Sequence, residues 1–330
     1  MQANTTLLLD RKTISALMTP GDYLIAVRDG LIAAHRGQAH AQPPMHVPGI
    51  GGGFHAKGAF LDGERPVVAV KLNGNFPDNP ARTRLPTIQG AALLCDARDG
   101  RLLAILDSIE LTVRRTAAAT ALAAQHLARP DAATLAICGC GGQALAQAEA
   151  LIEVLPIARV AAWDIASERA AAFCDRLGAR TELAVEVAGN LAAATLGADV
   201  VVTCTTARAP FLTLEHVAPG TFVAAVGADS PDKSELFPEL LGCSKVVVDS
   251  LEQCLQMGDL RHAVAAGAMR PDDVHAELGA VLAGATPGRS GDRDIWIFDS
   301  TGTALQDVAS AMAVYDKALA LGAGTAFALA

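Results

Sequence analysis

Short, strand-sized apolar runs alternate with helix-sized segments from Thr134 to about residue 299. Such alternation, with short turns between the elements, is typical of a parallel sheet whose two faces are covered by helices. The sequence therefore predicts an α/β fold with a doubly wound parallel sheet. The expected strands are Thr134–Cys138, Arg159–Trp163, Arg180–Val187, Val200–Thr203, Thr221–Val226, Lys245–Asp249 and Asp294–Asp299.

The first 110 or so residues follow a less regular pattern. The stretch Gln38–Lys57 is rich in proline, glycine and histidine and is predicted to be a long loop, a kind of segment that is often functional. Three later runs predict strands, and the turn Asp99-Gly100 joins the last two as a hairpin. The expected elements are a strand at Leu7–Asp10, helices at Thr13–Met18 and Asp22–His35, and strands at Val67–Leu72, Ile88–Cys95 and Arg101–Leu106.

Two further helices set the predicted domain division. The helix Thr112–Leu127 opens with Arg114 and Arg115, which oppose the macrodipole of a first turn. This placement indicates either an anion bound at that point or two exposed arginines. The amphipathic helix Thr303–Gly322 has no strand after it and is expected to pack on the first domain. The predicted domains are residues 1–120 plus 304–330, and residues 121–303.

Charge and composition narrow the expected partners. The 330 residues carry a formal net charge of −9 and no lysine or arginine cluster, so neither nucleic acid nor an anionic membrane is expected. No apolar run reaches the roughly 18 residues that cross a bilayer, and the N-terminal segment lacks an export signal. The seven scattered cysteines indicate reduced thiols in a cytoplasmic protein. Three histidines, His40, His46 and His55, lack other ligands at metal-site spacing, which favours a substrate-lining or surface role and no metal.

A glycine turn separates the first strand of the parallel sheet from an alanine-rich helix. Gly139, Gly141 and Gly142 let the backbone turn sharply, and the N–H groups of the helix start favour a negative charge. Strand, turn and helix together predict a pyrophosphate site. Asp164, 25 residues after Gly139, can accept hydrogen bonds from an adenosine ribose and repel a 2′-phosphate. NAD(H) is therefore preferred and NADP(H) possible, unless Asp164 only caps the following helix.

Polar residues follow two later strands, at the carboxyl ends where parallel sheets bind ligands. Thr203 and Thr205 follow one strand, and their hydroxyls are candidates to contact the ribose or nicotinamide. Val226 and Gly227 follow the next strand and lead to Asp229, which is either a site residue or a turn-forming aspartate.

Lys71 lies within the apolar, β-branched run of an expected strand. Burying a lysine is costly unless an anion meets it. The pattern therefore favours a paired, functional lysine, and the alternative is an edge-strand lysine whose ammonium reaches solvent.

Six stretches carry a resemblance to a known family: VKLNGNFPDN, LPTIQG, LTVRRTAAATALAAQHLA, CGCGGQALAQ, VGADSPDKSEL and FDSTGTALQDVASA. Together they resemble the ornithine cyclodeaminase/mu-crystallin family, in the family's order and over roughly residues 1–325. The resemblance implies an NAD(P)-binding Rossmann domain and a dimerising α/β domain that is built from the N-terminus and the final helix.

The resemblance also implies roles for individual residues. Lys71 matches the active-site lysine, Arg115 the arginine that binds the substrate carboxylate, and Asp229 the catalytic aspartate. Arg115 is also a candidate for the cofactor phosphates. The implied cofactor-binding residues are Thr87, Gly139, Gly141, Gln143 and Asp164, to which the strand-end pattern adds Gly142, Thr203, Thr205, Val226 and Gly227.

Two departures from the family pattern bear on the substrate. Many members carry a carboxylate-binding arginine in the loop where this chain has His46, which becomes a substrate-binding candidate. Cyclodeaminases place a glutamate for the substrate's second ammonium where this chain reads Phe54–Ala59, without a carboxylate. These departures favour reduction of a cyclic 2-imino acid such as Δ1-pyrroline-2-carboxylate or Δ1-piperideine-2-carboxylate over ornithine cyclisation. The resemblance also leaves open an alanine-type dehydrogenase and a non-catalytic, mu-crystallin-like binder.

Overall fold

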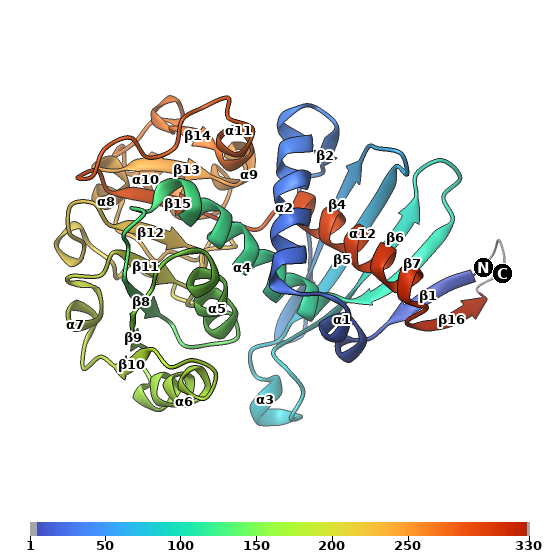
Figure 1. Cartoon of the computed structure of the whole chain (residues 1–330), viewed down its shortest axis with the longest axis horizontal. Coiled ribbons are helices and arrows are strands. Elements are labelled where there is room, and N and C mark those ends of the chain that lie inside the picture. Colours follow the sequence, from blue (N-terminus) through green and yellow to red (C-terminus); the bar gives the residue numbers. More distant parts are fainter. Residues whose placement is uncertain (1–4, 329–330) are drawn as a thin grey trace. The chain divides into compact units, whose positions relative to one another are not determined.

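The computed structural model describes residues 5–328. Contacts divide the chain into two compact units, one of residues up to 115 together with those from 303 onward, the other of residues 116–302. Each unit is built on its own sheet of eight strands (Figure 1).

The first unit contains a mixed sheet in the order β16-β1-β7-β6-β5-β4-β2, with β3 paired to β4. β1 is parallel to β7, and the other neighbouring pairs are antiparallel. β5 therefore lies inside the sheet, between β4 and β6. The strands are β1 (Thr5–Leu9), β2 (Ala39–Ala41), β3 (Met45–Gly49), β4 (Gly52–Leu61), β5 (Val67–Asn75), β6 (Ile88–Asp96), β7 (Leu102–Asp107) and β16 (Thr325–Ala328).

Helices cover one face of this sheet. α12 (Ala304–Leu321) packs on β4 and β5 and against α2 (Pro20–His35), while α1 (Arg11–Leu17) and α3 (Asn79–Arg82) are short. The crossing of α2 and α12 is close, because a Cβ added at Gly30 would lie 2.6 Å from the Cβ of Ala309. We call the face under α2 and α12 the inner face, and the opposite one the outer face.

Residues 38–57 are not the predicted loop, because they form β2, β3 and the start of β4. The hairpin of β3 and β4 closes at Gly51, whose φ of +75° suits a glycine. The backbone hydrogen bonds of this hairpin form without an alternation of apolar and polar side chains. The composition of the segment therefore predicted a loop. Pro48 is tolerated because β3 pairs only with β4.

Two other predictions at element ends are also wrong. α4 (Ser108–Leu127) begins four residues early, because the Asp107 carboxylate accepts the N–H groups of Ile109 (3.0 Å) and Glu110 (2.9 Å). Arg115 therefore lies beyond the first turn, and the argument from the macrodipole fails. A strand, β16, does follow α12, since β1 offers it an open sheet edge.

The second unit holds the predicted parallel sheet, in the order β10-β9-β8-β11-β12-β15-β13-β14, which confirms the predicted fold class. Its strands are β8 (Thr134–Cys138), β9 (Arg159–Trp163), β10 (Ala184–Val187), β11 (Val200–Thr203), β12 (Phe222–Ala225), β13 (Lys245–Val248), β14 (Ala276–Glu277) and β15 (Trp296–Asp299). Its helices include α5 (Ala144–Val154), α6 (Ser167–Gly178), α7 (Leu191–Thr195), α8 (Pro238–Gly242), α9 (Leu251–Cys254), α10 (Asp259–Ala265) and α11 (Leu278–Leu282).

The strand order reverses between β8 and β11, since β9 and β10 follow on one side and β12 on the other. Thr203 at the end of β11 pairs with both Cys138 and Ala225, so three strands end at one level. Ligands of such sheets bind at the carboxyl ends around this reversal.

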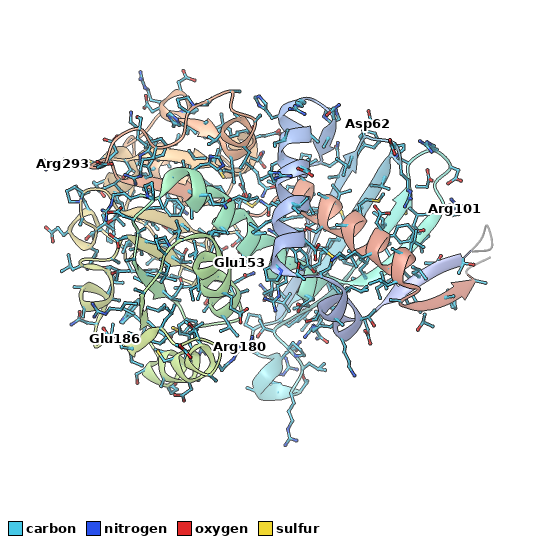
Figure 2. All side chains as sticks on the ribbon, viewed as in Figure 1. Asp62, Arg101, Glu153, Arg180, Glu186 and Arg293 are labelled. Atoms are coloured by element: carbon cyan, nitrogen blue, oxygen red, sulfur yellow. The ribbon has the colours of Figure 1, made fainter. Side chains whose placement is uncertain are left out.

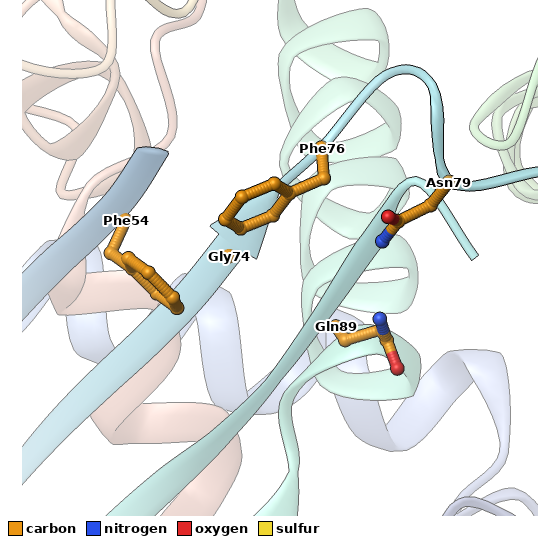
Figure 3. A pocket seen from close by; sticks show the side chains of 5 residues that line it. All are labelled: Phe54, Gly74, Phe76, Asn79 and Gln89. Atoms are coloured by element: carbon orange, nitrogen blue, oxygen red, sulfur yellow. The ribbon is translucent and has the colours of Figure 1, made fainter. Parts of the chain in front are cut away.

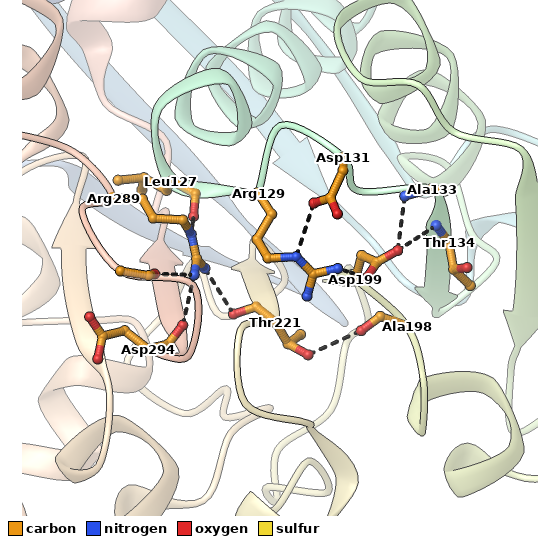
Figure 4. A network of polar contacts seen from close by, with 11 residues as sticks. Leu127, Arg129, Asp131, Ala133, Thr134, Ala198, Asp199, Thr221, Arg289 and Asp294 are labelled. Carbon is orange, nitrogen blue, oxygen red and sulfur yellow. Dashed lines mark hydrogen bonds and ion pairs between the residues drawn. The ribbon is translucent and has the colours of Figure 1, made fainter.

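The opposite ends of these strands are fixed by a polar network (Figure 4). The Asp199 carboxylate accepts the N–H groups of Ala133 (2.8 Å) and Thr134 (2.9 Å) and pairs with the guanidinium of Arg129 (2.5 Å). Arg289 donates to the carbonyl of Leu127 (2.6 Å). These bonds fix the start of β8 and so the position of the glycine turn at its other end.

Charged side chains line the outside of each unit. The six that Figure 2 labels, Asp62, Arg101, Glu153, Arg180, Glu186 and Arg293, are all exposed. Among residues 5–328, no helix has the length and apolar character that a bilayer span requires.

Candidate functional site

The glycine turn at the end of β8 has an open backbone. Gly139 has a φ of +96°, and a Cβ there would lie 2.6 Å from Cγ2 of Thr205, so only glycine fits. Gly141 and Gly142 are exposed, with no atom within 4 Å of an added Cβ. α5 begins directly after them, and its N-cap residue Gln143 makes no capping hydrogen bond. Uncapped N–H groups at the start of an eleven-residue helix are suited to bind an anion.

Asp164 lies beside this turn, at the end of β9. Its carboxylate accepts the N–H groups of Cys140 (2.8 Å) and Ala166 (2.9 Å). The N-cap of α6 is Ala166, so the alternative of Asp164 as that cap is wrong. A carboxylate has about four acceptor positions, so Asp164 can still accept from ribose hydroxyls. The glycine turn, the start of α5 and the Asp164 carboxylate together thus fit a dinucleotide.

Glu235 joins the two loops that follow β11 and β12, and sequence reasoning missed it. Its carboxylate accepts the Thr203 hydroxyl (2.7 Å) and the N–H groups of Thr205 (2.6 Å) and Gly227 (2.9 Å). The hydroxyl of Thr203, a predicted cofactor contact, is therefore turned inward to Glu235 and fully buried. Burial, followed by the nearby Asp259 carboxylate, raises the pKa of Glu235 to about 7.

Asp229 lies two residues beyond Gly227 and is accessible. Its side chain is 55% exposed and pairs with the ammonium of Lys233 at 2.5 Å. Val226 and Gly227, which precede it, are buried and directly follow β12. Within the second unit the predicted residues on β8, β9, β11 and β12 therefore lie at one edge of the sheet.

A second cluster lies on the inner face of the first unit. Lys71 on β5 donates to the carboxylate of Asp307 (2.8 Å) and the hydroxyl of Thr112 (3.1 Å). Arg115 on α4 donates to the same carboxylate (2.9 Å) and to the side-chain carbonyl of Gln306 (2.8 Å). Since β5 is an interior strand and Lys71 is only 4% exposed, the edge-strand alternative is wrong.

Burial dominates the electrostatics of this cluster. It lowers the pKa of Lys71 to about 7, Asp307 opposes this, and the charges of Arg115 and Lys57 lower the pKa further. Burial raises the pKa of Asp307, but the charges of Arg115 and Lys71 outweigh it, so the net shift is downward. The cluster therefore favours an ionised carboxylate at Asp307 and lowers the cost of deprotonating Lys71.

Two other predicted residues belong to the first unit. Thr87, just before β6, is half-buried, and its carbonyl accepts the N–H of Phe76 (2.8 Å). His46 on β3 is exposed, with its ring 4.7 Å from that of His55. A separate pocket of about 310 Å³ is lined by Phe54, Gly74, Phe76, Asn79 and Gln89, the residues that Figure 3 labels.

Asp307 and Gln306 were also missed, although a signal was present. Both lie in the first turn of α12, and Asp307 is on its buried side with Ala311, Val314 and Ala318. Asp307, Ala311 and Val314 follow the i, i+4, i+7 spacing of one helix face. A carboxylate on a buried helix face needs a cation, so this spacing would have indicated Asp307 as a counter-ion for Lys71.

Comparison with known proteins shows one family and close structural likeness. The profile of the ornithine cyclodeaminase/mu-crystallin family matches residues 5–322. An archaeal alanine dehydrogenase dimer with bound NAD is 36% identical, with a TM-score of 0.93 over 99% of this chain and 100% of that one. The Δ1-pyrroline-2-carboxylate reductase of Thermococcus litoralis, in complex with NADH and L-proline, is 30% identical (TM-score 0.93; 97% and 99% covered). The iminosuccinate reductase of Paracoccus denitrificans with NAD⁺ is 34% identical (TM-score 0.88; 98% and 99% covered).

Proposed function

Because the chain belongs to the ornithine cyclodeaminase/mu-crystallin family, we propose that it is an NAD(H)-dependent oxidoreductase that reduces cyclic 2-imino acids. The substrate class is represented by Δ1-pyrroline-2-carboxylate and Δ1-piperideine-2-carboxylate, and the product is the cyclic L-amino acid. NADH supplies a hydride to the imine carbon when bound, and a proton is added to the nitrogen. The residues of this chain orient the substrate, hold its charge and supply that proton.

The Lys71–Asp307–Arg115 cluster is the observation that carries the proposal. Lys71 has three N–H donors and Arg115 five, and the hydrogen bonds described above use two of each. The remaining donors can bind a substrate carboxylate, while Asp307 fixes both side chains in place. Orientation of the imine by such a clamp contributes a large part of the rate in reactions of this kind.

Asp229 is assigned the protonation of the imine nitrogen. The iminium is a better hydride acceptor than the neutral imine, so a proton donor accelerates the reaction. The accessible carboxylate of Asp229, whose side chain is 55% exposed, supports this role. A protein that only binds ligands would have no use for a proton donor.

The second unit is proposed to bind NAD(H), and NADP(H) less well. The open glycine turn and the adjacent Asp164 carboxylate support the first part. A carboxylate at this point repels the 2′-phosphate of NADP(H), which supports the second.

The first unit is proposed to bind substrate and to form a homodimer in the cytoplasm. Its outer face exposes apolar side chains on four adjacent strands, which favours pairing with a second copy. We call this the outer apolar patch; it consists of Met45, Val47, Phe54, Val70, Leu72 and Leu93. All seven cysteines are free thiols, which suits a reducing compartment.

The test is NADH oxidation by the purified protein with Δ1-pyrroline-2-carboxylate, beside ammonia release from L-ornithine with NAD. We expect imine reduction and little ammonia, because Lys57 lies opposite Lys71 in the sheet and disfavours a second substrate ammonium. Faster ornithine turnover than imine reduction at neutral pH would instead establish a cyclodeaminase.

A further inference from the structure

Gln306 is a fully buried amide in the first turn of α12, beside Arg115. Its Oε1 accepts a hydrogen bond from Nη1 of Arg115 at 2.8 Å. An arginine side chain only donates hydrogen bonds, so this contact determines which end of the amide is oxygen and which is nitrogen. The Nε2 group, with two N–H donors, therefore has to find its acceptor elsewhere.

The Nε2 of Gln306 is buried and has no hydrogen-bond acceptor among residues 5–328. A buried donor without an acceptor is costly, and proteins usually satisfy it with water or a ligand. Since Nε2 and Oε1 share one carbon atom, Nε2 also lies close to Arg115. A group that accepts from the remaining N–H donors of the guanidinium can therefore accept from Nε2 as well.

The charges beside Gln306 favour an anion as this acceptor. Lys71 and Arg115 are cations, and both pair with the one carboxylate of Asp307, at 2.8 and 2.9 Å. With Lys71 protonated, the three side chains sum to one positive charge, and all three are buried. Buried charges are stable only when they are paired. A water molecule can accept from Nε2 but cannot balance this charge, whereas a carboxylate does both.

The start of α12 adds to the same preference. Thr303, its N-cap residue, is 1% exposed and makes no side-chain capping bond, and its Oγ1 has no partner within residues 5–328. Residues three apart are neighbours on a helix surface, so Thr303 and Gln306 share a face. The N-terminal end of an eighteen-residue helix also favours a negative charge.

We propose that Gln306 is a substrate-binding residue whose Nε2 donates a hydrogen bond to the carboxylate of the 2-imino acid. This inference rests on the proposed function, since it places that carboxylate on Arg115 and Lys71. Oε1 holds the guanidinium while Nε2 binds a carboxylate oxygen, so one amide joins the arginine to the substrate. Gln306 thereby selects a carboxylate over a neutral carboxamide, because the –NH2 of a carboxamide presents hydrogen atoms where Nε2 needs an acceptor.

The test uses Gln306→Glu, which keeps an acceptor for Arg115 and replaces the Nε2 donors with a second acceptor. The probes are pyrrole-2-carboxylate and pyrrole-2-carboxamide, planar ligands that are titrated into the protein–NADH complex by calorimetry. The wild type should bind the carboxylate about tenfold more tightly or better. In Gln306→Glu the order should reverse, and the carboxamide should bind about tenfold more tightly than it binds the wild type, since its N–H groups donate to the new carboxylate.

The gain in carboxamide binding separates direct contact from an effect of charge alone. A negative charge near Arg115 weakens the carboxylate complex even without contact, but it does not strengthen the complex with a neutral ligand. Weaker carboxylate binding without a gain for the carboxamide would overturn the inference, as would unchanged binding of both. Gln38→Glu makes the same change at an exposed position of the same unit and should leave both dissociation constants at their wild-type values.

Steady-state kinetics with Δ1-pyrroline-2-carboxylate give a second readout. The substrate carboxylate is unchanged by the reaction, so a hydrogen bond to it stabilises the bound substrate and the transition state alike. Gln306→Met, which removes the amide at similar volume, should raise KM about tenfold and change kcat by only about twofold. A loss confined to kcat would contradict the proposed contact.

A crystal structure of the wild type with NADH and pyrrole-2-carboxylate decides the question if the variants do not fold. A carboxylate oxygen within hydrogen-bond distance of Nε2 is the expected result, and a water molecule in its place would overturn the inference. Absence of NADH oxidation with every cyclic imine would overturn the proposed function instead, whatever the two pyrrole ligands show.

Discussion

Individual residues of the Lys71–Asp307–Arg115 cluster differ in how far the sequence reveals them. Lys71 interrupts an apolar strand, so its burial and need for an anion could be predicted. Its counter-ion could not, because Asp307 is 236 residues away. Glu235 was concealed in the same way, since only the folded sheet brings it to Thr203 and Gly227. The local sequence pattern thus identifies a residue whose burial is costly, and only the folded structure shows the partner that offsets this cost.

Asp307→Asn should destabilise the protein strongly. The change leaves two buried cations, Lys71 and Arg115, without their shared carboxylate, and breaking such a buried pair costs about 3–5 kcal/mol. Urea unfolding followed by circular dichroism measures the loss. Asp316→Asn on the same helix removes an exposed partner of Arg65 and should cost about 1 kcal/mol or less. Equal effects of the two variants would show that the cluster contributes little to stability.

Asp164→Ala should weaken NADH binding and narrow the preference for NADH over NADPH by about tenfold. The carboxylate is proposed to bind the ribose and repel a 2′-phosphate, and it also holds the N–H of Cys140. Dissociation constants from NAD(P)H fluorescence measure both effects. Asp175→Ala, an exposed change on α6, should leave the ratio unchanged. A wild-type preference for NADPH would contradict the assignment.

At the scale of elements, the sequence predicted the strands that have a regular apolar pattern and missed those that do not. The parallel strands were predicted well because each is an apolar run that helices cover, so composition and structure coincide. β2, β3 and β4 were missed because their pairing depends on backbone hydrogen bonds and a glycine at φ +75°. The start of α4 was missed because a carboxylate just outside the helix, Asp107, sets it.

Glu235 connects the loops after β11 and β12, and its contribution to stability depends on pH. Its pKa is about 7 in the folded protein and near 4.5 when unfolded. Between these values the folded state holds a proton that the unfolded state has lost. The contribution to stability is therefore present at low pH and disappears as the pH rises through 7, by on the order of 3 kcal/mol.

Glu235→Gln should remove this dependence. The free energy of unfolding of the wild type, measured relative to the variant, should fall between pH 5 and pH 8. Glu239→Gln, an exposed change four residues later, should follow the wild-type profile. Parallel profiles for wild type and Glu235→Gln would mean that Glu235 is already ionised at pH 5.

At the scale of the whole molecule, the two units divide the chemistry between them. The second unit carries an open glycine turn and a carboxylate that fit a dinucleotide, and its pattern is readable from sequence. The first unit carries the buried cations, and its mixed sheet is less regular, so its inner and outer faces emerge only from the register of β4, β5 and β6. Residues of one strand therefore alternate between the Lys71–Asp307–Arg115 cluster and the outer apolar patch.

Because neighbouring residues of β5 point to opposite faces, dimer formation can be tested without changing the Lys71–Asp307–Arg115 cluster. Leu72 follows Lys71 on β5, points to the outer face and is 46% exposed. Leu72→Glu should convert a dimer to a monomer, because a carboxylate at the centre of an apolar interface would be desolvated without a partner. Light scattering after size-exclusion chromatography measures the mass. Leu321→Glu, at an exposed position near the end of α12 in the same unit, should leave the dimer intact. A wild-type monomer, or a dimer that survives Leu72→Glu, would show that the outer apolar patch is not the subunit interface.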